Sequence, residues 1–177
     1  MEYRLLGTDL KQKYRDEMLQ MLVSSDQEFV PPLSSRASTT QADLSGTVVC
    51  EKGVLPYFEQ MCSQRILGAF EGDALVGIVS FKEDYVGEHI PEEEKPNIYI
   101  STLLLKPETR GKGLTAHMYA FLFETCYPRC KVFTRTWSTN AAHIRILEKF
   151  GFQQICCLEN DRGAGIHTVY FRRDAIQ

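Results

Sequence analysis

A short run of small and basic residues has the types and spacing of an anion-binding turn. The run consists of Arg110, Gly111, Lys112, Gly113, Leu114 and Thr115. It lies between an apolar stretch and a helical pattern, so the first N–H groups of a helix are expected there, unpaired and partly positive. The two glycines permit positive φ and leave no Cβ beside a ligand, and the two basic residues add charge at the rim. We predict a site for an anion such as a pyrophosphate, the alternative being a plain surface turn.

The composition is that of one globular domain. The chain has 177 residues, of which 44% are hydrophobic and 24% charged, and its formal net charge is −3. This length can bury a core, so we predict a single domain over residues 1–177. The charge argues against a general nucleic-acid or membrane-surface binder, and no apolar run approaches the roughly 20 residues of a membrane span. The first residues lack the pattern of a secretory signal, so we expect a cytoplasmic protein.

The cysteines are interpreted as reduced thiols. The sequence contains Cys50, Cys62, Cys126, Cys130, Cys156 and Cys157. Their spacing matches no metal-site pattern and includes no Cys-x-x-Cys pair, so no metal is predicted. Because no export signal is expected, these thiols should serve as small apolar side chains.

The periodicity of hydrophobic residues predicts alternating strands and helices. Strands are predicted at residues 3–6, 66–71, 74–81, 98–105, 131–137, 152–158 and 167–172. Helices are predicted at residues 11–23, 56–63, 114–122 and 141–150. The polar residues 24–45 are expected to form an ordered loop or a wrap over the sheet. This order of elements predicts an α/β (α+β) fold, a mixed sheet with helices on both faces.

Two segments resemble the GNAT superfamily of N-acetyltransferases. Residues 103–113, an apolar strand followed by a proline and the glycine turn, are similar to the acetyl-CoA-binding segment of that family. Residues 140–142 and Gly151-Phe152 resemble the second segment, in which an asparagine opens a helix that ends in Gly-Phe. The similarity covers about residues 65–172. It implies a GNAT-type mixed, mostly antiparallel central sheet of about seven strands with helices on both faces.

The resemblance also implies how acetyl-CoA is bound. Leu103, Leu104 and Leu105 would offer main-chain groups to the pantetheine arm. The turn from Arg110 to Thr115 would hold the pyrophosphate through consecutive N–H groups, with a threonine at position 115 where the family usually has Gly or Ala. Asn140 would bond the cofactor arm through its amide, and a role as helix N-cap is compatible with that contact.

The implied reaction is a direct attack of an amine on the thioester of acetyl-CoA. An amine with a pKa of about 10.4 is protonated at pH 7, and neutralising it costs about 4.6 kcal/mol, so a base is needed. The oxyanion would need an N–H donor, expected on the strand near Leu104. The usual catalytic positions of the family are replaced. Ser101 stands in the place of a strand glutamate, Arg135 in that of a second acid, and Leu147 in that of a tyrosine.

Ser101 and Asp84 remain as catalytic candidates. Ser101 is predicted to order a water that relays the amine proton, the alternative being a small residue that suits a tight sheet. Asp84 is predicted to act as a base or to anchor the cation of the acceptor, the alternative being a solvated hairpin end. It belongs to an acidic stretch, residues 82–97, whose six carboxylates would concentrate a cationic amine. A soluble charged loop is the simpler interpretation of that stretch.

Two functions from different classes follow. The first is an N-acetyltransferase that transfers the acetyl group of acetyl-CoA to a primary amine of a small, cationic acceptor; a longer acyl group is an alternative donor. The second is a GNAT-fold module that binds acetyl-CoA or a partner with little turnover, which the three replaced residues favour. The expected partner is a small-molecule amine, with no nucleic acid and no membrane, and a homodimer is left open.

Overall fold

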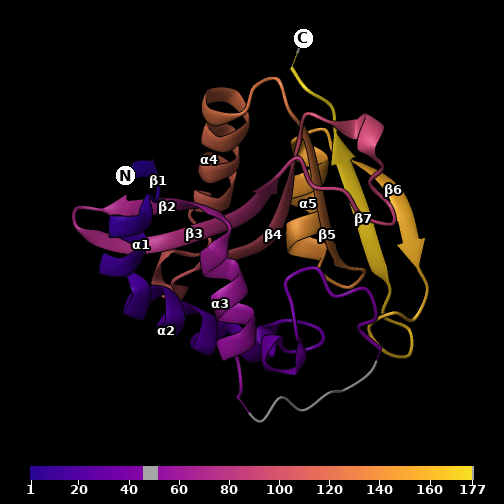
Figure 1. Ribbon diagram of the computed structural model, residues 1–177, viewed down its shortest axis with the longest axis horizontal. Coiled ribbons are helices and arrows are strands. Elements are labelled where there is room, and N and C mark those ends of the chain that lie inside the picture. Colours follow the sequence, from indigo (N-terminus) through magenta and orange to yellow (C-terminus); the bar gives the residue numbers. More distant parts are fainter. Residues whose placement is uncertain (46–51, 177) are drawn as a thin grey trace.

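A central sheet separates two helical layers in the computed structural model, which describes residues 1–45 and 52–176 (Figure 1). The strands are β1 (Glu2–Leu5), β2 (Arg65–Glu71), β3 (Ala74–Glu83), β4 (Asn97–Leu105), β5 (Lys131–Trp137), β6 (Gln153–Leu158) and β7 (Thr168–Arg173). Their order across the sheet is β1-β2-β3-β4-β5-β7-β6. Strands β4 and β5 pair in parallel, and the other neighbours in the described sheet are antiparallel. The predicted mostly antiparallel sheet of about seven strands is confirmed.

Helices cover both faces of this sheet, as predicted (Figure 1). One face carries α1 (Thr8–Lys13), α2 (Arg15–Ser25) and α3 (Leu55–Ser63), and the other carries α4 (Leu114–Ala120) and α5 (Ala141–Lys149). A π-helical segment, Phe121–Cys126, continues α4. Alternate residues of the central strands point to opposite faces, so Ile78 packs in the core beneath α2 and α3, and Val79 in the core beneath α4 and α5.

The first helical region differs from the prediction of one helix over residues 11–23. The structure has two helices, α1 and α2, separated at Tyr14, whose backbone leaves helical geometry with φ −101° and ψ 18°. The Tyr14 side chain is buried, its ring lies 5.1 Å from the ring of Phe70, and its hydroxyl donates to the carbonyl of Asp73 at 3.2 Å. These contacts with the β2–β3 hairpin are tertiary, so helical periodicity alone could not reveal the break.

The polar region after α2 forms the predicted wrap over the sheet. Within residues 26–45, Leu33, Arg36, Thr39 and Leu44 are buried. The carbonyl of Gln41 accepts a hydrogen bond from Arg135 of β5, and that of Val30 accepts one from Arg162, between β6 and β7. The wrap therefore holds the ends of three strands together.

The cysteines in the described residues are free thiols: Cys62, Cys126, Cys130, Cys156 and Cys157. Cys50 lies outside the described residues.

An irregularity in β4 sets the position of the site. Ser80 of β3 pairs with Thr102 of β4 and Phe81 pairs with Ile100, so Ser101 has no partner in β3. Such a bulge bends a strand. The parallel pairing of β4 with β5 ends at the same place, at Ile100 opposite Thr134. Beyond that point the two strands separate.

Candidate active site

A cleft of about 390 Å³ lies where β4 and β5 separate, a size typical of small-molecule sites. Leu103, Leu104 and Leu105 line one wall, and residues 134–137 of β5 line the other. Because β3 pairs with only one edge of β4, alternate N–H and C=O groups of residues 101–105 face the opening. An extended ligand arm can bond to them as a neighbouring strand would.

The glycine turn forms one end of this cleft. Gly111 and Gly113 have φ of 73° and 75°, which L side chains rarely adopt. Helix α4 begins at Leu114, and its first internal bond runs from His117 N–H to the carbonyl of Gly113. Within the described chain, the N–H groups from Gly111 to Ala116 donate to no protein acceptor. A Cβ built on either glycine meets no atom within 4 Å, so the space beside the two glycines is open. The turn therefore fits a phosphate group.

The residues that flank these glycines behave differently from one another. Lys112 is exposed, and Thr115 is buried but lines the cleft. Arg110 also lines the cleft, but its side chain is bonded to protein groups. Its N–H bonds to Pro107, and its guanidinium donates to Glu28 at 2.9 Å and to the carbonyl of Leu105 at 3.2 Å. Arg110 therefore ties the glycine turn to the end of α2.

Asn140 opens α5 beside the same cleft. Its Oδ1 accepts the N–H of His143 at 3.3 Å, and its Nδ2 donates to Thr136 at 3.0 Å. The predicted helix N-cap is confirmed. One amide hydrogen remains for a ligand, so the contact with the cofactor stays a prediction.

His143 and Tyr119 form a pair that the sequence did not reveal. Tyr119 Oη lies 2.8 Å from His143 Nε2, and His143 lines the cleft. Desolvation by burial lowers the pKa of His143 to about 4, so its ring is neutral at pH 7. The neutral ring carries one N–H and one acceptor nitrogen, and either the Tyr119 hydroxyl or His143 Nε2 is the donor in this bond. His143 thus brings a neutral imidazole to the cleft.

Ser101 also lines the cleft, but its hydroxyl belongs to a polar chain behind it. Ser101 Oγ donates to Gln64 Oε1 at 2.5 Å and lies 2.9 Å from Ser80 Oγ. Gln64 in turn donates to Thr39 at 2.6 Å. This chain contains no carboxylate or imidazole, so it offers no base. One lone pair of Ser101 remains to order a water.

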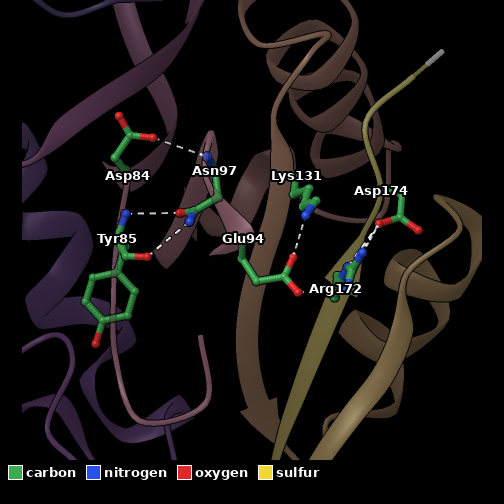
Figure 2. Close-up of polar contacts among 7 residues, drawn as sticks. All are labelled: Asp84, Tyr85, Glu94, Asn97, Lys131, Arg172 and Asp174. Atoms are coloured by element: carbon green, nitrogen blue, oxygen red, sulfur yellow. Dashed lines mark hydrogen bonds and ion pairs between the residues drawn. The ribbon is translucent and has the colours of Figure 1, made fainter. Parts of the chain in front are cut away.

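Asp84 does not lie with Ser101. It sits at the start of β4, where its N–H donates to the carbonyl of Asn97 at 2.8 Å and its carboxylate accepts the N–H of Asn97 at 3.4 Å (Figure 2). The four residues from Asn97 to Ser101 span about 13 Å of strand. Asp84 is absent from the lining of the cleft among the described residues.

The acidic stretch of residues 82–97 likewise lies outside the cleft lining, and half of its carboxylates are paired. Glu94 contacts Lys131 at 2.8 Å and Arg172 at 3.0 Å, as Figure 2 shows. Glu83 lies 3.8 Å from Arg65, and Glu92 lies 2.7 Å from Lys95. This arrangement weakens the expectation that the stretch attracts a cationic acceptor.

The replaced family positions have structural surroundings of their own. Leu147 is fully buried in the core beneath α4 and α5. Arg135 lines the cleft and donates to the carbonyl of Gln41 at 2.6 Å and to the hydroxyl of Tyr170 at 3.2 Å. Among the described residues that line the cleft, one carries a carboxylate, and it is Glu28. No local pattern in the sequence had indicated this residue.

Other kinds of site find no support in the described ranges, 1–45 and 52–176. They contain no cluster of three or more His, Cys, Asp or Glu side chains that could hold a metal ion. Over the same ranges, every helix is too short or too polar to cross a bilayer.

The sequence matches the model of the acetyltransferase (GNAT) family over residues 36–152. No curated protein matches the sequence.

Solved structures with similar folds span almost the whole chain. The aminoglycoside 6'-N-acetyltransferase from Enterococcus faecium has a TM-score of 0.67 at 11% identity, covering 100% of this chain and 98% of that one. The ribosomal-protein-alanine N-acetyltransferase from Brucella melitensis has a TM-score of 0.65 at 14% identity, covering 98% and 99%. The yncA protein from Salmonella typhimurium, solved with acetyl-CoA, has a TM-score of 0.64 at 16% identity, covering 100% and 95%. At these identities the likeness concerns the fold.

Proposed function

This chain belongs to the acetyltransferase (GNAT) family, and from that premise we propose that it transfers the acetyl group of acetyl-CoA to the primary amine of a small acceptor. The observation that carries the proposal is the run of N–H groups from Gly111 to Ala116, which have no acceptor in the described protein. The space beside Gly111 and Gly113 is open, and Gly111 and Thr115 line the β4–β5 cleft. These groups fit the pyrophosphate of the coenzyme, with Lys112 exposed beside them. The open edge of β4 at Leu103, Leu104 and Leu105 suits its extended arm.

Acetyl-CoA supplies an acetyl group activated as a thioester. A main-chain N–H of β4 near Leu104 is the proposed donor to the developing oxyanion, since a fixed donor in a cleft costs no reorganisation. On the opposite wall, the neutral imidazole of His143 lines the cleft. We assign to it the hydrogen bond to the leaving sulfur, because Leu147 leaves no tyrosine hydroxyl for that role.

The amine must lose a proton before it can attack. Glu28 lines the cleft and is the candidate to accept this proton, directly or through water. Its ion pair with Arg110 holds it in place. Ser101 is the candidate to order that water through its remaining lone pair. Asp84 stays a prediction for attraction of the acceptor at the outer edge of the sheet, because it has no contact with the cleft.

The acceptor is proposed only as a small primary amine. The structural neighbours include enzymes named for an aminoglycoside and for the alanine of a ribosomal protein, so this fold serves unlike acceptors. The free cysteines favour a reducing compartment, and we place the reaction in the cytoplasm.

The second candidate is a module that binds acetyl-CoA with little turnover. It is favoured by the replacement of the usual catalytic residues at Ser101, Arg135 and Leu147.

One experiment separates the two candidates. Thiol release from acetyl-CoA is measured with a panel of monoamines, diamines, amino sugars and amino acids, and thermal stability is measured in parallel with acetyl-CoA. We expect release with at least one amine, and stabilisation of about 2.7 kcal/mol at 100 times Kd. Stabilisation without any release would favour the binding module. If acetyl-CoA does not stabilise the protein, the proposed cofactor site is wrong.

A further inference from the structure

Three arginines lie near the β5 wall of the cleft, one in its lining and two behind lining residues. Arg36, in the wrap after α2, and Arg162, between β6 and β7, are each only 6% exposed. Arg135, on β5, is partly buried and lines the cleft. Guanidinium groups are seldom buried without a charged partner.

Among the described residues, the acceptors of these guanidinium groups are neutral oxygens. Arg36 donates twice to the carbonyl of Pro31, at 3.1 and 2.7 Å. Arg162 donates to the carbonyl of Val30 at 2.6 Å and to the hydroxyl of Thr168 at 2.8 Å. Arg135 donates to a carbonyl and to a tyrosine hydroxyl, as described above. In the described part of the chain, none of the three lies within 4 Å of a carboxylate.

The nearby carboxylates are engaged elsewhere. Asp161 accepts the hydroxyl of Thr168 at 2.5 Å, so one hydroxyl stands between it and Arg162. Asp26 accepts the N–H and hydroxyl of Ser34 at 2.7 and 2.8 Å. The cluster therefore keeps a surplus of positive charge.

Two aromatic rings that line the cleft contact two of these arginines. The rings of Phe29 and Trp137 lie 5.7 Å apart, and both residues line the cleft. The guanidinium of Arg36 lies 5.6 Å from the ring centre of Phe29, and that of Arg162 lies 5.8 Å from that of Trp137. Cation–π contacts of this kind help to hold the charges near the cleft.

The positive charges also act on one another. Burial lowers the pKa of Arg162 to about 9, and the charges of Arg36 and Arg135 contribute to the shift. Burying like charges together is unfavourable unless a counter-charge is supplied. A bound anion would supply it, and guanidinium groups are well suited to small oxyanions.

We propose that the acceptor amine also carries a small oxyanion, a carboxylate or a phosphonate, which binds at the Arg36, Arg135 and Arg162 cluster. This inference rests on the proposed function and names the substrate class of that site. The acceptor then has an amine that reacts and an anion that orients it, as an amino acid does. The sequence alone suggested a cationic acceptor from the acidic stretch, which lies outside the cleft lining, and the proposed acceptor carries an anion as well.

The first test uses the unaltered protein and matched acceptors. Thiol release from acetyl-CoA is compared for amino acids, for their amides, and for aminophosphonates of the same carbon skeleton. We expect kcat/KM for the better anionic form to exceed that of the amide at least tenfold, about 1.4 kcal/mol. The amine of an amide is less basic and more often neutral, so intrinsic reactivity works against this result. Amides that react as well as both anionic forms across the panel overturn the inference.

The same acceptors also give a binding readout. If no amine releases thiol, the proposed turnover fails, and thermal stability with CoA present still tests the acceptor class. Stabilisation by an amino acid or aminophosphonate but not by its amide supports the inference. Equal stabilisation by both, or by neither, overturns it.

Variants then separate binding from structure. Arg135→Gln and Arg36→Gln are compared with Arg129→Gln, which removes an exposed arginine away from the cleft. Stabilisation by acetyl-CoA reports that each variant is folded. We expect KM for the anionic acceptor to rise at least tenfold in Arg135→Gln and to change less than twofold for the amide. A similar change for both acceptors indicates a merely structural arginine and overturns the inference. If Arg36→Gln does not fold, Arg135→Gln and the matched acceptors still decide.

Discussion

The two ends of the parallel β4–β5 pair are built in opposite ways. At the end where the strands begin, the ladder from Asn97 opposite Lys131 to Ile100 opposite Thr134 is closed, and Glu94 bridges Lys131 and Arg172 (Figure 2). At the other end the strands separate, and the N–H groups of the glycine turn have no acceptor in the described protein. The comparison teaches that satisfied polar groups stabilise the fold at the closed end, while unsatisfied ones at the open end are available to ligands.

The largest expected effect is a loss of stability in acid, caused by His143 at the open end. Its pKa is about 4 in the folded protein and about 6.5 when unfolded. Between these values the unfolded chain binds more protons, so stability falls as pH falls from 6.5 towards 4, by about 2 to 3 kcal/mol at pH 4.5. Denaturation at pH 7 and pH 4.5 measures this loss. In His143→Phe the loss of stability between pH 7 and pH 4.5 should be smaller by about 2 to 3 kcal/mol. An equal loss in both proteins would contradict a lowered pKa of His143.

Gly113→Asp should disrupt phosphate binding at the glycine turn. The carboxylate would fill the open space beside the N–H groups and repel a phosphate, so Kd for acetyl-CoA should rise at least tenfold, about 1.4 kcal/mol. Isothermal titration measures the change. Gly113→Asn controls for the positive φ without the charge. Gly72→Asp places an acid at another positive-φ glycine, in the β2–β3 hairpin. Unchanged affinity in folded Gly113→Asp would remove the proposed cofactor site.

Glu94→Ala removes the ion pairs at the closed end of the β4–β5 pair. The variant leaves Lys131 and Arg172 without their shared carboxylate, and we expect a loss of about 1 kcal/mol in the free energy of unfolding, because the pairs are partly exposed. Affinity for acetyl-CoA should not change. The exposed neighbour provides the matched control, Glu93→Ala. A weaker affinity in Glu94→Ala would mean that the two ends are coupled.

The smallest effect is expected from Ser101→Ala, at the junction of the two ends. Loss of the hydroxyl removes the proposed water contact and the donor to Gln64. We expect kcat to fall about threefold to tenfold and stability to fall by about 1 kcal/mol. A lower kcat in steady-state kinetics, with an unchanged Kd for acetyl-CoA, would identify a role in proton transfer. Lower stability with unchanged kcat would leave Ser101 a structural residue.

The features that the sequence predicted depend on neighbours along the chain. The glycine turn before α4, the Asn140 cap of α5 and the strands that make the sheet all arise from local spacing. The predicted order of elements therefore held, and the family resemblance could be seen in the same segments. The break at Tyr14 was missed because its cause, contact with Phe70 and Asp73, comes from a distant hairpin.

The features that the sequence missed are assembled from distant segments. Tyr119 and His143 come from different helices, and Glu94 meets its partners from β5 and β7. The pairing of Glu94 was hidden because a list of carboxylates does not show which cations face them.

The sequence by itself determined the glycine turn proposed to hold the coenzyme, because consecutive backbone N–H groups and glycines at fixed spacing are sufficient to build it. Only the tertiary structure decided the proposed acceptor site, where Arg36, Arg135 and Arg162 come from the wrap, β5 and the β6–β7 connection. The physical reason is that charge acts through space. Three guanidinium groups far apart in sequence form one positive site only after folding brings them together and burial removes the water between them.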